Sequence, residues 1–550
     1  MGFRAWLVAV ALLLELAAQP LGVLRIKVTI VDADGHARPV PRHALLISEN
    51  PSTATPQRTI TAMDGTAEVH LRPGNYTVES DQPLIFQGKA YEWRQTLDVA
   101  SGRPTFLELT AGNAQIEAAA SVSPSAVLPS GAVGNASGLL LDWQSSVVSI
   151  WSPTSLGSGF LVDARGLIAT NQRLVGKARS LEVQLSPTEK VAGRVLASDP
   201  DRNVAILWID PKAVASVRQV KLGYSDGRPP IAEKDKVVAI NTPIHDPKSL
   251  TSGTVSRVTA HAILSDVRLD DDSLGAPLFN TAGEVIAITT PEDERSVGSS
   301  ASRAVRIDEA RSVIAGAEQK MQTSEAPNGT RLPVEPQRPF EDEALKDAAQ
   351  RRTGSLAPYR VPAADFDVSL ITPVLVYGAR HQGEQVSGRE PGRTGRDPAE
   401  MQASLRALED FGNWSDYVRD YPPVLMIRAT PKLVESLWTT IARGAAQTQG
   451  VSLPPIKHIK AGFSTMRLTC GDVEVTPIHP FKIEQRVGQT DGLYEGLYVF
   501  DPGAIGPHCG TVKLTLLSDK DPEKGDTRVI DPKILQQIWQ DFAPWYAKLP

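Results

Sequence analysis

The stretch DSLGAPLFN at residues 272–280 is the last of four short segments from which the fold of this chain can be inferred. The three earlier segments read GSGFLV at 157–162, TNQRLV at 170–175 and DPDRNVAIL at 199–207. Each joins a short apolar run to Gly, Asp or Asn, a pattern that indicates short β-strands separated by tight turns. Apolar runs broken in this way are typical of a double β-barrel.

In order and spacing, the four segments resemble the HtrA/Deg branch of the chymotrypsin-fold serine proteases. The resemblance implies a trypsin-like protease domain over residues 138–317. In that family the second segment carries a catalytic histidine, the third an aspartate, and the fourth a serine within G-N-S-G-G-P-L. Arg173, Asn203 and Leu274 occupy these three positions here. The resemblance therefore implies a protease scaffold with a degenerate triad.

The chemistry of each replacement argues against peptide hydrolysis. A triad needs a hydroxyl to attack, an imidazole to take its proton, and a carboxylate to support the imidazolium. Leu274 has no nucleophilic atom, and Arg173 stays protonated at physiological pH and has no acceptor atom. Asn203 accepts hydrogen bonds but carries no negative charge. We therefore expect no catalytic residue at these positions.

One alternative keeps an active hydrolase. Ser273 precedes the aligned serine position by one residue, and the usual glycine pair has become Gly275-Ala276. A turn shifted by one residue would point Ser273 into the cleft and make it the fallback nucleophile of a serine endopeptidase. No histidine or lysine stands at either matching position to serve as its base, so a non-catalytic domain is the leading interpretation.

Charge near the serine position also opposes catalysis. The run Asp270-Asp271-Asp272 precedes it, where a developing oxyanion would be stabilised by positive potential. Because the histidine and serine segments meet at the cleft in the family, we expect Arg173 to lie near Asp271 or Asp272 and to fill the old site with an ion pair.

Three further segments support the same fold. KVVAINTP at 236–243 and TSGTVS at 251–256 match a strand, a turn and a following strand of the family. GEVIAI at 283–288 predicts a turn and a buried strand.

Composition and termini point to an exported globular protein. The chain has 550 residues, enough for three domains, and a net charge of -6, which gives no reason to expect nucleic acid or an anionic membrane as a partner. Residues 1–22 resemble a signal peptide: Arg4 precedes the apolar run from Ala5 to Leu14, which is short for a membrane span. We therefore expect a periplasmic or extracellular protein without a membrane span in the mature chain.

Residues 23–112 are predicted to form a small β-sandwich. Leu24 to Val31 alternates apolar and polar residues as a half-buried strand does. The run from Asp64-Gly65 through Pro73-Gly74 to Tyr76 and Val78 resembles the carboxypeptidase-regulatory-like, transthyretin-like sandwich, in which we expect both of the last two side chains to face the core.

Two linkers and a third domain complete the predicted organisation. Residues 113–137 are rich in Ala, Ser, Gly and Pro, and residues 318–356 are polar and contain prolines, so both are predicted linkers. Residues 357–550 are predicted to form an α/β (α+β) domain of unassigned type. The whole chain is thus expected to be mainly β: a sandwich, a chymotrypsin-like double barrel and an α/β unit.

Within the third domain, residues 378–397 read as a polar loop, and residues 431–443 show helical spacing. The closing segment from Ile534 to Lys548 has aromatic residues at three- and four-residue steps, which favours a helix packed on its own domain over a docking surface.

The only two cysteines, Cys470 and Cys509, are predicted to form one disulfide, because an even pair in an exported protein is usually oxidised. The histidines are scattered and no C-x-x-C motif occurs, so we expect no metal and no cofactor. For a different catalytic site in this domain, the candidates are Asp410, Asp416, His479 and His508, and nothing in their spacing marks a triad.

Together these features favour an exported pseudoprotease that binds an extended peptide or a protein partner. A chymotrypsin-type cleft holds peptide partly by β-strand pairing, which does not need the triad. The alternatives are an active hydrolase that uses Ser273 and a purely structural spacer.

Overall fold

The computed structural model describes residues 21–32, 35–51, 55–118, 136–226, 230–243, 248–269, 273–290, 302–351, 359–386, 417, 420–435, 457–485 and 493–547. The chain divides into two compact units, Met1–Val147 with Phe160–Ala164 and Ser216–Arg311, and Val148–Gly159 with Arg165–Ala215 and Ser312–Pro550. Most predicted signal-peptide residues lie outside the described residues.

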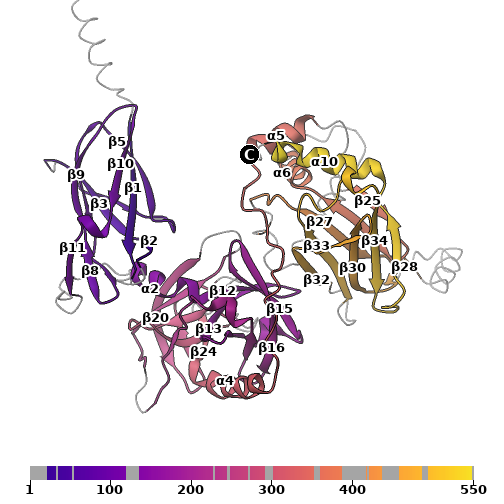
Figure 1. Cartoon of the computed structure of the whole chain (residues 1–550), viewed down its shortest axis with the longest axis horizontal. Helices are drawn as coiled ribbons and strands as arrows, with labels where there is room; N and C mark the ends of the chain where they lie inside the picture. Colours follow the sequence, from indigo (N-terminus) through magenta and orange to yellow (C-terminus); the bar gives the residue numbers. More distant parts are fainter. Residues whose placement is uncertain are drawn as a thin grey trace, which may run out of the picture. The chain divides into compact units, whose positions relative to one another are not determined.

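The N-terminal domain is a β-sandwich built from two four-stranded sheets and a smaller three-stranded one. Its strands are β1 Gly22–Val31, β2 Ala37–Pro39, β3 Ala44–Glu49, β4 Gln57–Ile60, β5 Thr66–Leu71, β6 Gly74–Ser80, β7 Leu84–Phe86, β8 Lys89–Glu92, β9 Arg94–Val99, β10 Pro104–Leu109 and β11 Gln115–Ala118 (Figure 1). The first sheet contains β10, β1, β5 and β2, and the second runs β4-β3-β6-β9.

The alternation predicted for the first strand is present. Leu24, Ile26, Val28 and Ile30 of β1 are all at most 1% exposed, and the residues between them face outward. Tyr76 and Val78 of β6 also face the core, with exposures of 5% and 0%. Both predictions are therefore confirmed.

The sandwich continues into the range predicted as the first linker. β11 pairs antiparallel with β8, and the 3-10 helix Ala111–Asn113 leads into it. The helix α2, Ala136–Trp143, begins where the predicted linker ends. The Ala- and Ser-rich composition there concealed a strand because β11 is fully exposed and buries no apolar face.

The protease-like region contains two β-barrels. The first is closed in the order β12-β13-β14-β17-β16-β15, and the second is a seven-stranded sheet, β18-β23-β22-β19-β20-β21-β24, in which β23 also pairs with β24. Their bounds are β12 Val147–Trp151, β13 Leu156–Asp163, β14 Leu167–Asn171, β15 Ser180–Ser186, β16 Glu189–Asp199, β17 Val204–Trp208, β18 Lys221–Leu222, β19 Lys236–Asn241, β20 Ser249–Val258, β21 Ala262–Ser265, β22 Pro277–Phe279, β23 Glu284–Thr289 and β24 Ser302–Arg306. The β23–β24 pairing closes six strands into a ring, so the predicted mainly-β fold with a chymotrypsin-like double barrel is confirmed.

The first barrel requires Gly159 of the GSGFLV segment as well as the apolar residues of that segment. A Cβ on Gly159 would lie 2.5 Å from Ile150 Cδ1 and 2.9 Å from Ile168 Cγ2, closer than real Cβ contacts allow. Glycine therefore lets β13 approach its two neighbouring strands inside the first barrel.

The range predicted as the second linker is partly structured. Helix α4, Ile307–Gln322, reaches into it, and helix α5, Asp342–Arg351, lies within it. Between the helices the chain runs beside β16. Arg331 forms an isolated antiparallel β-bridge with Val191, and Leu332 N–H donates to Lys190 C=O at 2.8 Å. This segment binds a barrel edge through its backbone, which composition alone does not reveal.

The C-terminal domain is α+β, as predicted. A five-stranded sheet, β25-β26-β27-β33-β32, and a four-stranded sheet, β31-β30-β34-β35, share one apolar core with α5, α6 and α10 (Figure 1). Their bounds are β25 Tyr359–Pro362, β26 Phe366–Ile371, β27 Leu425–Pro431, β30 Phe463–Cys470, β31 Val473–Val475, β32 His479–Gln485, β33 Leu493–Phe500, β34 Val512–Ser518, β35 Asp526–Val529, α6 Pro373–Val386 and α10 Pro532–Tyr546; β28 Leu433–Glu435 and β29 Lys457–Ile459 form a separate pair.

Two local predictions in this domain are wrong. Residues 378–386 belong to helix α6 rather than to a loop, and residues 431–435 are extended in β27 and β28 rather than helical. The remainder of both ranges lies outside the described residues. The closing helix is confirmed as a core element, because Ile538, Phe542 and Trp545 of α10 belong to the domain core.

Candidate functional site

The first triad position lies at a tight helical turn. Arg173 belongs to α3, Gln172–Val175, which directly follows β14. The buried Asn171 side chain accepts a hydrogen bond from Arg173 N–H at 2.8 Å and so caps this turn. The Arg173 side chain itself is exposed. A guanidinium here donates hydrogen bonds but cannot take a proton from a nucleophile.

The second position adopts an unusual backbone conformation. Asn203, between β16 and β17, has φ of 57°, in the left-handed region that asparagine tolerates better than most residues. Its C=O accepts a hydrogen bond from Gln172 N–H at 3.3 Å, which links the two triad segments of this barrel. Among the described residues its Oδ1 is buried and has no hydrogen-bond partner. An amide at this place supplies no charge to stabilise an imidazolium.

The third position lies in the turn before β22. Leu274 follows Ser273, whose side chain is 1% exposed. Asn241 Nδ2 donates a hydrogen bond to Ser273 Oγ at 3.1 Å, and Asn241 Oδ1 accepts one from Ser249 Oγ at 2.7 Å. The fallback nucleophile thus sits in a chain of polar side chains from β19 and β20, and the amide nitrogen that contacts it is a donor, not a base.

Hydrogen bonds from the side chain and the backbone of Thr289 fix the same turn. Thr289 Oγ1 donates to Ser273 C=O and accepts from Ala276 N–H at 2.8 Å. Gly275 has φ of 83°, and its N–H donates to Thr289 C=O at 3.1 Å. These contacts hold the turn in the register that buries Ser273.

Several predicted partners lie outside the described residues. Asp270, Asp271 and Asp272 do, so the ion pair expected for Arg173 stays a prediction. Asp410 and Asp416 lie outside them as well.

The comparisons with known proteins match the same stretch of chain. The family model for a trypsin-like peptidase domain matches residues 157–288. This region is a trypsin-like peptidase domain. It is similar to the domains of HtrA-type proteases, so the predicted resemblance is confirmed for this part of the chain.

Curated relatives are named as probable periplasmic serine endoproteases, DegP-like. The protein from Ectopseudomonas mendocina is 34% identical over 152 residues, which cover 26% of this chain and 31% of the relative. The one from Marinomonas sp. is 30% identical over 153 residues, again 26% and 31%. The chain thus spans about a third of the length of these relatives. Their name confirms the expectation of an exported, periplasmic protein.

Solved structures were also found. A serine endoprotease from Yersinia pestis is 22% identical with a TM-score of 0.30, covering 33% of this chain and 66% of that one. The structure of Deg5 is 24% identical with a TM-score of 0.28, covering 32% and 90%.

Sequence patterns missed a buried polar cluster in the second unit. Lys190 of β16 is 1% exposed, and its Nζ donates to Glu182 Oε2 of β15 at 2.9 Å and to Ile478 C=O. His479 of β32 is 2% exposed, and its ring nitrogens lie 3.2 Å from carboxylate oxygens of Glu182 and Glu335. Tyr417 Oη donates to Glu335 at 2.7 Å.

The donors and acceptors in this cluster are matched. The Lys190 ammonium donates to Glu182, and each ring nitrogen of His479 faces a carboxylate oxygen, which accepts from a nitrogen that carries hydrogen. The Trp151 ring is centred 4.0 Å from the imidazole.

Burial and neighbouring charges shift the pKa values of three groups in this cluster. Burial acts to raise the pKa of Glu182, but the hydrogen bonds and charges of His479 and Lys190 outweigh it and hold that pKa below its ordinary value. Burial lowers the pKa of Lys190, against the opposing effect of Glu182 and Glu335. Burial and the Glu335 charge raise the pKa of Tyr417 well above its usual range, so the phenol stays a donor. We interpret the cluster as a structural junction of the second unit.

None of the helices in the described part of the chain is long and apolar enough to cross a membrane. The same residues contain one group of three potential metal ligands, Cys470, His508 and Cys509. The two sulfur atoms are joined in a disulfide, so they are not thiolate ligands in this structure.

Proposed function

We propose that this protein is an exported pseudoprotease that binds an extended peptide or an unfolded protein segment in the periplasm without cleaving it. The observation that carries the proposal is the joint occupation of the triad positions by Arg173, Asn203 and Leu274. None of the three can act in the role of the residue it replaces, and the losses remove nucleophile, base and supporting charge together.

The environment of Ser273 supports the same proposal. A serine nucleophile needs an exposed hydroxyl and a nearby base. Ser273 is 1% exposed and its Oγ accepts from the Asn241 amide. Bringing it to the cleft would break that bond and the hydrogen bonds of the Thr289 side chain to the same turn. The buried position therefore favours a structural role for Ser273 over the alternative of an active endopeptidase.

Binding can persist where hydrolysis has been lost. Chymotrypsin-type barrels hold substrates largely through backbone hydrogen bonds to an extended chain, and these depend on strand edges rather than on the triad. The relatives are named endoproteases of the periplasm, where unfolded segments would be the corresponding ligands. The proposed activity is therefore peptide binding without the cleavage step.

The test combines covalent labelling with a binding measurement. The mature chain is treated with a fluorophosphonate probe beside an active trypsin-like protease, and adducts are located by peptide mapping. Binding of fluorescein-labelled casein is followed by anisotropy, and its cleavage by gel. We expect no adduct, no cleavage and saturable binding.

Two serine variants sharpen the result. Ser273→Ala removes the fallback nucleophile, and Ser265→Ala removes another buried serine of the second barrel, which is hydrogen-bonded to Ser302 at 3.1 Å. An adduct or casein cleavage that disappears only in Ser273→Ala would establish an active hydrolase and refute the proposal. If casein is neither bound nor cleaved, the result would support a purely structural spacer instead.

A further inference from the structure

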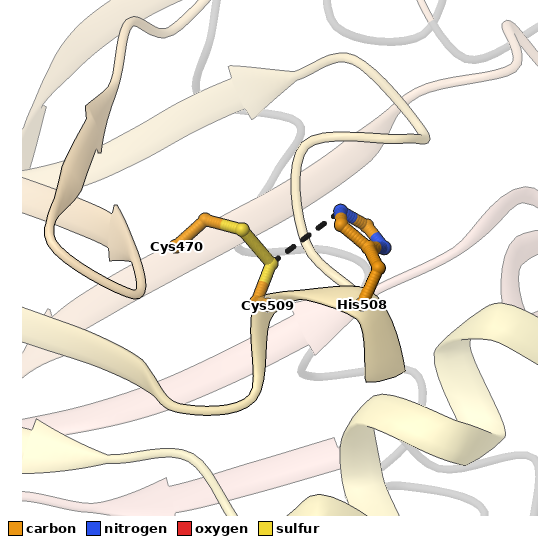
Figure 2. Close-up of side chains that lie close together, drawn as sticks. All are labelled: Cys470, His508 and Cys509. Atoms are coloured by element: carbon orange, nitrogen blue, oxygen red, sulfur yellow. Dashed lines mark hydrogen bonds between the residues drawn. A yellow bond between two sulfur atoms is a disulfide. The ribbon is translucent and has the colours of Figure 1, made fainter.

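The single disulfide of the C-terminal domain lies beside a histidine. Cys470 ends β30, and Cys509 is the last residue of the 3-10 helix η7, Pro507–Cys509, which precedes β34. His508 Nε2 lies 3.5 Å from Cys509 Sγ, and Figure 2 shows the imidazole beside that sulfur. Both cysteines are half-buried and His508 is exposed, so the group lies at the surface of its domain.

The bond is not what holds the two strands together. β30 and β34 pair antiparallel from Phe463 with Ser518 to Cys470 with Val512. Beyond the last pair, Gly471 N–H donates to Thr511 C=O at 2.8 Å. Because this ladder already fixes both chain ends, we expect opening of the disulfide to leave the sheet folded, which makes reversible chemistry at the sulfur atoms feasible.

The histidine distinguishes the two sulfur atoms chemically. In thiol–disulfide exchange the sulfur whose thiolate is better stabilised leaves faster. A protonated imidazole next to a cysteine stabilises its thiolate. His508 contacts Cys509 Sγ, and its ring packs 5.8 Å from Trp539 of α10, which helps to keep it in place.

We propose that the Cys470–Cys509 disulfide is a thiol-exchange site for low-molecular-weight thiols of the glutathione class, with Cys470 as the sulfur that is modified and Cys509 as the leaving group. The incoming thiolate forms a bond to Cys470 Sγ while the Cys470–Cys509 bond breaks. The electron pair of that bond stays on Cys509 Sγ as a thiolate paired with the His508 imidazolium. One disulfide is consumed and one is formed, so no external oxidant or reductant is required.

The proposal is tested on the full mature chain with glutathione. Reactions at pH 6.0 and pH 8.5 are quenched with acid, free thiols are alkylated, and peptides are mapped by mass spectrometry. Each rate is divided by the concentration of glutathione thiolate at that pH. We expect the glutathionyl group on Cys470 and the alkyl group on Cys509. In His508→Gln, the rate at pH 6.0 should fall about tenfold, because the leaving thiolate of Cys509 loses the imidazole that lies beside it.

The control variant His36→Gln makes the same change at an exposed histidine of the N-terminal domain and should leave rate and regiochemistry unchanged. Circular dichroism of His508→Gln checks that it is folded. A native protein whose disulfide resists glutathione would overturn the proposal. So would modification chiefly at Cys509, or a His508→Gln rate equal to that of the original protein at pH 6.0.

Discussion

At the scale of single residues, the side chains around the predicted triad positions shape their segments. Asn171 caps the turn that carries Arg173, and Thr289 ties the turn that carries Leu274. These contacts act on the backbone and need no reactive group at the triad position. The scaffold can therefore persist with an arginine at 173 and a leucine at 274.

Burial sets the charge of another residue, His43 in the N-terminal domain. Its side chain is 4% exposed, with Nε2 3.1 Å from Ser80 Oγ and the ring 5.3 Å from Trp93. Burial lowers its pKa to about 4, against a smaller opposing effect of Asp81. The folded domain therefore holds His43 in its neutral form.

The sign of the pH dependence follows from this shift. Because the pKa of His43 is lower in the folded state, the unfolded chain binds its proton first as pH falls. Stability should be unaffected above about pH 6.5 and should fall between pH 6.5 and about 4. The full loss is about 3 kcal/mol. Hydrogen exchange of β3 and β6 amides, corrected for intrinsic rates, measures it.

His43→Gln keeps a polar partner for Ser80 but does not titrate. The variant should lose the acid-dependent part of the destabilisation while other acid effects remain. An equal loss of protection between pH 6.5 and pH 4.5 in both proteins would show that His43 is not the responsible group.

At the scale of elements, the aromatic residues of helix α10 could either pack on their own domain or form a docking surface. Phe542 is 0% exposed within the domain core, whereas Trp539 is 38% exposed. We expect Phe542→Ala to destabilise the C-terminal domain by about 3–5 kcal/mol and Trp539→Ala by about 1 kcal/mol. Hydrogen exchange of β30 and β34 reads out both. A larger effect of Trp539→Ala would contradict the assignment of the buried face.

Sequence patterns predicted the elements whose burial is regular, either alternating or continuous. The alternation in β1 and the apolar run of β23 are visible because each residue's burial follows a period of two or a continuous stretch. Helix α6 was missed because it contains Gly378 and Gly383, which have low helix propensity. Tertiary packing of Val374 and Leu375 in the core overrides that preference.

The triad positions could be predicted from the sequence because they sit in motifs of fixed local spacing, and their assignment stays a prediction. The buried cluster could not be found in this way. Glu182, Glu335 and His479 are far apart in the chain, and although His479 is a candidate from the sequence, no spacing connects it to the two glutamates. Only the tertiary fold brings their charges together.

At the scale of the whole molecule, the second unit joins residues of the first barrel, the connecting segment and the C-terminal sheet through this cluster. A buried lysine and a buried histidine lie against two half-buried carboxylates, so each charged group depends on the others for compensation. Breaking one partner of a buried pair commonly costs about 3–5 kcal/mol, because it leaves an unpaired charge behind. The cluster should therefore make these segments unfold together.

A double-mutant cycle tests that dependence. Lys190→Met leaves an excess negative charge and Glu182→Gln an excess positive charge, so each should cost about 3 kcal/mol. The double variant retains the His479–Glu335 pair and should cost about 2 kcal/mol less than the sum. Hydrogen exchange of peptides covering β15, β16 and β32 gives these values.

The control is the exposed pair Arg25 and Glu68, whose side chains are 53% and 46% exposed. Its cycle of Arg25→Met and Glu68→Gln should show a coupling energy below about 1 kcal/mol. Additive costs at Lys190 and Glu182, or β32 exchange unchanged by Lys190→Met, would mean that the cluster does not couple the barrel to the C-terminal sheet.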